Sequence, residues 1–114
     1  MSTVLDTATA TVLTIDARPD LDPIDVIFLD CEERGRGRVI VRCYWQSWTA
    51  YWGAMGDHDV RSFFLSAWPD YIAGNLVAGT AGLQLARKRD LQLGYVTRIV
   101  KAIQEALRKQ ENAR

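Results

Sequence analysis

Two different hydrophobic periods divide the chain near residue 56. Before it, three short segments rich in β-branched and apolar residues predict β-strands at residues 7–16, 24–31 and 38–45. Turn-forming residues separate them, in the "RPDLDP" and "ERGRG" stretches. The third strand is the most regular. Its predicted faces are Val39, Val41, Cys43 and Trp45 on one side, and Arg38, Ile40, Arg42 and Tyr44 on the other.

Helical spacing begins after residue 56. Val60, Phe63, Phe64 and Ala67 lie at that spacing and predict a short helix, with Asp57 as its N-cap and Asp59 in its first turn. Pro69 breaks this helix and suits the first position of a second one.

A long amphipathic helix is predicted last, over about residues 85–110. The order of elements predicts an α+β fold, in which a small antiparallel sheet of about three strands is followed by two or three helices packed on one face. At 114 residues the chain is expected to form a single domain, residues 1–114, with residues 1–22 loosely attached.

Large aromatic residues gather where the two periods meet, and one more follows in the helical half. They are Tyr44, Trp45, Trp48, Tyr51, Trp52 and Trp68. Residues 48–52 can continue the third strand, but successive side chains of a strand point to opposite faces, so these rings cannot all point inward. We therefore expect part of this set in the core and part in an interface, where Trp and Tyr are enriched. In a protein of this size that interface is most often a homodimer.

The net charge of zero hides an asymmetry between the two halves. Residues 1–33 carry eight acids and one arginine, a net of −7, and residues 34–114 carry thirteen bases and six acids, a net of +7. Such a division is typical of proteins that bind nucleic acid or that self-associate through opposite patches. Alternatively, the two halves neutralise each other within one fold.

Arginines at a hairpin tip and along one strand face, interleaved with aromatics, are typical of surfaces that bind single-stranded nucleic acid. The candidate contacts are Arg34, Arg36, Arg38 and Arg42, with Arg98 and Lys101 on the last helix. The pI near 6.6 and the acidic first 33 residues argue against this interpretation.

The sequence does not favour an enzyme. His58 is the only histidine, and its acidic neighbours are explained by helix capping, so we expect no catalytic residue and no metal site. The glycines fit no phosphate-binding loop, and no cofactor is expected. Two cysteines, the lack of a signal peptide and the lack of an apolar span of about 20 residues indicate a cytoplasmic protein without a membrane partner.

One motif combination resembles a known group of proteins. A strand ending in Cys-Tyr is followed by "WTAYWGAMG", a Phe-rich helix, an Asp-Tyr-x-x-x-x-Leu step and a basic amphipathic helix, "YVTRIVKAIQEAL". Over about residues 39–110 this resembles small proteins encoded by tailed bacteriophages and prophages. The resemblance implies a phage-derived cytoplasmic accessory protein, and it implies no activity and no catalytic residues.

These observations favour a phage-derived, non-enzymatic binding protein that acts through a protein–protein interface and modulates a host or phage protein. The acidic segment that contains Asp20, Asp22 and Asp25 would then mimic the charge of a nucleic acid. The alternative is a nucleic-acid-binding accessory protein that uses the basic hairpin and an aromatic sheet face.

Overall fold

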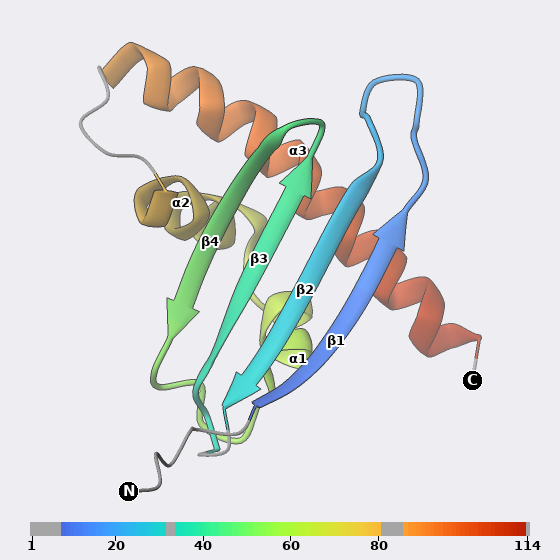
Figure 1. Ribbon diagram of the computed structural model, residues 1–114, viewed down its shortest axis with the longest axis vertical. Helices are drawn as coiled ribbons and strands as arrows, with labels where there is room; N and C mark the ends of the chain where they lie inside the picture. Colours follow the sequence, from blue (N-terminus) through green and yellow to red (C-terminus); the bar gives the residue numbers. More distant parts are fainter. Residues whose placement is uncertain (1–7, 32–33, 81–85, 114) are drawn as a thin grey trace, which may run out of the picture.

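A four-stranded antiparallel sheet is backed by three helices. The computed structural model describes residues 8–31, 34–80 and 86–113. The strands are β1 (Ala8–Ile15), β2 (Ile24–Cys31), β3 (Gly37–Cys43) and β4 (Gln46–Trp52), and the helices are α1 (Val60–Ser66), α2 (Pro69–Thr80) and α3 (Ala86–Asn112). Each strand pairs with the next, in the order β1-β2-β3-β4. The helices lie behind one face of the sheet, and no described helix or strand covers the other, which we name the bare face (Figure 1).

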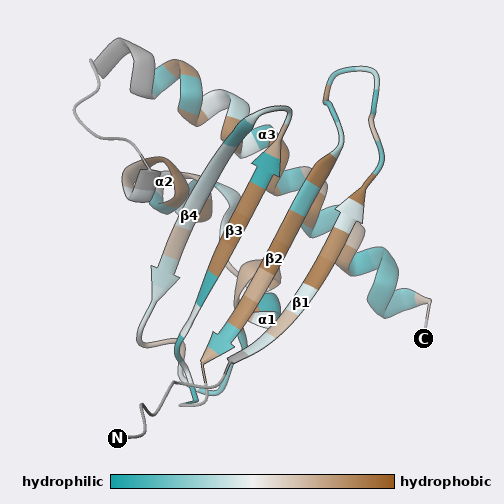
Figure 2. Ribbon diagram, in the orientation of Figure 1, coloured by the Kyte–Doolittle hydropathy of each residue, from teal (hydrophilic) through white to brown (hydrophobic). Residues whose placement is uncertain are grey.

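The two sheet faces follow from the alternation of the central strands. Val26 of β2, Val41 of β3 and Trp48 of β4 lie opposite one another in the register and are buried. The buried stripe of α3, from Val96 to Leu107, belongs to the same core. Apolar residues dominate β2 and β3, whereas the C-terminal turns of α3 are hydrophilic (Figure 2). The core therefore forms between α3 and the centre of the sheet, as expected for an apolar stripe packed on an apolar face.

The α+β class is confirmed, but the prediction of about three strands was short by one. Strand β3 ends at Cys43, and Cys43 pairs with Gln46 across a loop of two residues. Tyr44 has φ of 62°, which resembles a type II′ hairpin, in which the first loop residue has positive φ and is normally glycine. Neither loop residue is a usual turn former, so the sequence pattern did not predict this hairpin. Trp45 lies in the loop and not on the face of Val39 and Val41.

The first helix and its N-cap lie two residues later in the chain than predicted. The N-cap is Asp59, whose carboxylate accepts a hydrogen bond from the backbone N–H of Ser62 at 2.7 Å. Asp30 of β2 accepts a second backbone hydrogen bond, from Val60, at 2.7 Å. These two carboxylates satisfy N–H groups that the first turn of a helix leaves free, and Asp30 fixes α1 to the end of the sheet.

Helix α2 approaches the outer strand β4 at a glycine. A Cβ atom added to Gly79 would lie 2.3 Å from the carbonyl oxygen of Thr49, whereas one added to Gly74 of the same helix would meet nothing within 4 Å. Helix α2 can therefore lie against the backbone of β4 only because residue 79 has no side chain.

The two glycines of α2 should respond in opposite ways to alanine. We expect Gly79→Ala to lower the free energy of unfolding by roughly 1–3 kcal/mol, because the new methyl group overpacks against a backbone carbonyl. Gly74→Ala, the matched control, should raise it by about 0.5–1 kcal/mol through higher helix propensity. Urea unfolding followed by circular dichroism measures both, and an unchanged or raised midpoint for Gly79→Ala would contradict the close approach.

Candidate binding surfaces

The aromatic stretch is divided between core and surface. Trp48 and Trp52 are buried, at 1% and 6% exposure. Tyr44, Trp45 and Tyr51 are exposed, at 56%, 79% and 50%. Within β4 the division follows the alternation of the strand, since Tyr51 points to the bare face and its neighbour Trp52 to the helices.

Trp48 belongs to a small polar cluster at the edge of the core. Its indole N–H donates to the side-chain oxygen of Gln92 at 3.4 Å, and its ring lies edge-on to that of Tyr95 at 5.9 Å. The Tyr95 hydroxyl donates to the sulfur of Cys43 at 3.4 Å. Burial, followed by this hydrogen bond, raises the pKa of Tyr95 to about 12. The thiol of Cys43 is thus a buried hydrogen-bond partner within the fold.

Trp52 is held by ring packing alone. Its ring centroid lies 5.2 Å from that of Phe63 in α1. Its buried indole N–H has no acceptor within the part of the chain that the structure describes. Trp52 therefore contributes apolar contact area to the core and carries an unsatisfied donor, a group that proteins rarely bury.

The hairpin tip, Tyr44 and Trp45, presents two large rings to solvent. The ring centroids are 4.1 Å apart and the planes are tilted by 46°. A bulky residue at positive φ is uncommon, and strained backbone of this kind clusters at functional sites. The sequence predicted both residues as interface candidates but placed them in a strand. Their shared place at a tight turn is visible only in the fold.

The bare sheet face carries two of the predicted arginines. The guanidinium of Arg38 lies 5.8 Å from the ring centre of Tyr51, in cation–π range. The guanidinium of Arg42 lies 3.7 Å from a carboxylate oxygen of Asp25. At the neighbouring turn between β2 and β3, Arg34 lies 3.9 Å from Asp57, and Arg36 is exposed. Nearby acids therefore reduce the positive charge of this surface.

The remaining predicted residues lie on the helical layer, across the sheet from Arg38 and Arg42. Arg98 and Lys101 are exposed on α3, and Arg98 stacks on Tyr95 at 5.6 Å. Trp68, in the link between α1 and α2, is 82% exposed. The structure thus does not join the six predicted nucleic-acid contacts into one surface, because α3 covers the opposite face of the sheet (Figure 1).

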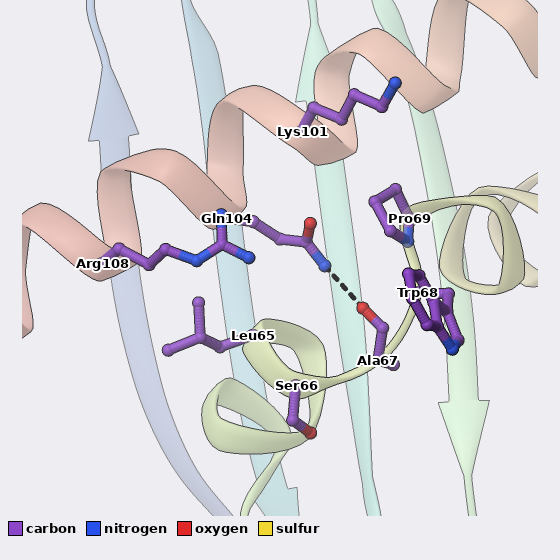
Figure 3. A pocket seen from close by; sticks show the side chains of 8 residues that line it. All are labelled: Leu65, Ser66, Ala67, Trp68, Pro69, Lys101, Gln104 and Arg108. Carbon is purple, nitrogen blue, oxygen red and sulfur yellow. Dashed lines mark hydrogen bonds between the residues drawn. The ribbon is translucent and has the colours of Figure 1, made fainter.

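A hollow of about 360 Å³ adjoins Trp68, and we name it the Trp68 pocket. Its lining comprises Leu65, Ser66, Ala67, Trp68, Pro69, Lys101, Gln104 and Arg108 (Figure 3). Gln104 is 2% exposed, and its amide N–H₂ donates to the backbone carbonyls of Phe64 and Ala67 at 3.0 and 2.9 Å. That amide fixes the extended link between α1 and α2, and with it the position of Trp68.

Sequence reasoning missed Gln104 and Arg108. A usable signal was present, because Gln104 follows Val100 by four residues and precedes Leu107 by three, a position in the apolar stripe of the helix. A polar residue at such a position is buried, and a buried amide requires partners.

A second hollow, of about 420 Å³, lies where the turn between β2 and β3 meets the start of α1. The exposed thiol of Cys31 and the ring of His58 both line it, and the ring nitrogen Nδ1 of His58 lies 2.6 Å from the hydroxyl of Ser62. In the described ranges, no three His, Cys, Asp or Glu side chains are grouped so that they could hold a metal ion.

Comparisons with known proteins agree with the resemblance seen in the sequence. A family model described as a phage family matches residues 4–92, which is more than half of the chain. The match begins before β1, so residues 4–38, which the resemblance left largely outside, also belong to the matched region. No curated protein and no solved structure gives a match. Among the described helices, none combines the length and the apolar character that a membrane span requires.

The Tyr95 cluster predicts a loss of stability in alkali. The pKa of Tyr95 is raised to about 12, so the folded state keeps a proton that the unfolded chain releases near pH 10. The free energy of unfolding should therefore fall as the pH rises from about 10 to about 12, and Tyr95→Phe should lose less over this range. Urea unfolding at about pH 9 and pH 11 measures the difference, with the exposed Tyr71→Phe as control. Equal losses in wild type and Tyr95→Phe would rule out this linkage.

Proposed function

Since the chain belongs to this phage family, we propose that it is a phage-derived, non-enzymatic binding protein that acts through protein–protein contacts. The proposal places it in the cytoplasm of the bacterial host as a homodimer that modulates a host or phage protein. It invokes no cofactor and no catalytic residue.

The hairpin tip is the observation that carries this proposal. Tyr44 and Trp45 expose large rings that the fold does not use, since the core is closed by Trp48 and Trp52. Rigid aromatic side chains bury a large area at low entropic cost, and they are enriched among the residues that dominate interface energies. The left-handed backbone of Tyr44 costs about 1–2 kcal/mol that glycine would avoid. The backbone strain at Tyr44 is explained if its exposed ring contacts a partner, because glycine at this position would avoid the strain but could not make that contact.

The bare sheet face supports a second candidate function, the binding of single-stranded nucleic acid. Arg38 and Tyr51 lie together on this face and are both exposed, which suits backbone charge neutralisation combined with base stacking. The zero net charge and the carboxylates beside Arg42 and Arg34 make this candidate the weaker of the two.

Tyr44→Gly should separate stability from partner binding. Glycine adopts positive φ without strain, so the variant should gain up to about 1 kcal/mol in free energy of unfolding and lose contact area for the partner. Chemical denaturation measures the first effect. A photo-crosslinking amino acid at position 45, compared with one at the exposed position 112 at the end of α3, identifies the partner. Binding of that purified partner to wild type, Tyr44→Gly and Trp45→Ser then measures the second effect. Full binding by both variants would exclude the tip as the contact.

The nucleic-acid candidate makes a separate prediction. Fluorescence anisotropy of a labelled oligothymidylate should show binding that weakens steeply between about 50 and 200 mM salt, because bound counterions are released. Arg38→Glu and Tyr51→Ala should abolish this binding, whereas Lys101→Glu on the opposite layer should leave it intact. Equal effects of Arg38→Glu and Lys101→Glu would argue against the sheet face as the binding site, and lack of binding at low salt would exclude the candidate.

A further inference from the structure

The Trp68 pocket contains a hydrogen-bond acceptor that the fold leaves free. Both hydrogen bonds of the Gln104 amide use its N–H₂ group, and its side-chain oxygen has no donor among the described residues. The close-up shows this oxygen directed away from Ala67, toward the space between Lys101 and Pro69 (Figure 3). A nearly buried amide whose acceptor faces a hollow is suited to receive an N–H group from outside.

Two cations flank this acceptor. Lys101 and Arg108 line the pocket from positions two turns apart on α3, and neither forms an ion pair within the described part of the chain. They are seven positions apart in the helix, a rise of about 10 Å. With the exposed ring of Trp68 at the opening, the pocket offers two positive charges, an acceptor and an aromatic surface. It therefore suits an acidic segment that also carries an apolar ring.

The chain itself contains a segment with this chemistry, which we name the acidic loop, residues 16–23 between β1 and β2. Hydrogen bonds of 2.8 and 3.2 Å between the backbones of Arg18 and Leu21 close its turn. The exposed residues in and beside this turn are Asp16, Pro19, Asp20, Asp22 and Pro23. The three carboxylates have no cationic partner among the described residues, although Arg42, Arg34 and Arg18 each have an acid nearby.

The acidic loop does not fill the pocket of its own copy. Arg18 holds the loop against α3 through Glu105, at 3.2 Å, and no residue of the loop lines the pocket. Unpaired acids and unpaired cations thus lie at separate places on one surface of zero net charge. The acids of one copy can therefore pair with the cations of another. In a dimer with a two-fold axis this contact forms twice, once in each direction.

We propose that the acidic loop of a second copy docks in the Trp68 pocket. Asp20 and Asp22 pair with Lys101 and Arg108, and a loop proline packs on the ring of Trp68, as prolines do in aromatic-lined grooves. A backbone N–H of the loop donates to the free oxygen of Gln104. This inference rests on the proposed homodimer and names its contact. It leaves the hairpin tip free for another protein.

A reciprocal charge swap tests the contact in the intact protein. The two double variants are K101E/R108E, which inverts the pocket, and D20K/D22K, which inverts the loop. Sedimentation velocity at low salt should show wild-type dimers, and each variant alone should raise the dissociation constant roughly tenfold or more. An equimolar mixture should restore a dimer with one copy of each, because each inverted surface then meets its opposite. Salt at about 0.5 M should weaken both dimers.

Control variants and outcomes separate this inference from the proposed function. R98E/D57K exchanges one base and one acid outside the pocket and the loop, so it should associate as wild type does. A mixture that stays monomeric, or variants that associate as wild type does, would overturn the pocket contact and leave the homodimer in place. A wild-type chain that is monomeric at all concentrations would overturn the homodimer and its contact together, and the tip would still be tested by its own partner. Circular dichroism and thermal unfolding of each variant exclude loss of folding as the cause.

Discussion

The pleat of β4 decides which aromatic residues build the fold and which stay available. Trp48 and Trp52 are four residues apart and point to the helices, and Tyr51 points away from them. The core is therefore closed by two indoles from one short strand, together with the stripe of α3. The remaining aromatic side chains of the stretch, Tyr44 and Trp45 at the tip, lie outside that alternation and are exposed, as is Trp68 in the link between α1 and α2. Within β4, the alternation alone thus decides which rings are buried and which are exposed.

The charged side chains also fall into two groups, those that lie in ion pairs and those that do not. Arg18, Arg34 and Arg42 each lie near an acid, so these exposed pairs contribute little to stability and little to the net field. Among the described residues, the carboxylates of the acidic loop and the cations of the Trp68 pocket are two groups of opposite charge that form no ion pair. Opposite patches on one surface favour a defined partner orientation more than they add affinity. A chain with zero net charge can therefore still bind selectively.

Much of this architecture could be predicted from the sequence, because the hydrophobic period changes once and cleanly. Strand 24–31 and the long last helix have strong patterns, and the structure places both within two residues of the prediction. The fourth strand was missed because Tyr44 and Trp45 form its turn without glycine, asparagine or aspartate. The cap at Asp59 was assigned to Asp57 because two aspartates two residues apart are equally good candidates. The Trp68 pocket could not be predicted, since it combines residues about 40 positions apart that only the packing of α3 brings together.

The order of elements also affects how the chain folds while it is being synthesised. All four strands precede all three helices, and each strand pairs with its neighbour in sequence. The sheet can thus form as soon as Trp52 has left the ribosome, but its apolar face stays uncovered until Leu107 has left it as well. At elongation rates of about 5–20 residues per second that interval lasts roughly 3–11 s. During it, a nascent chain carries an open sheet with an uncovered hydrophobic side, the kind of intermediate that chaperones bind. Yield in cells should therefore depend on how quickly translation reaches the end of α3.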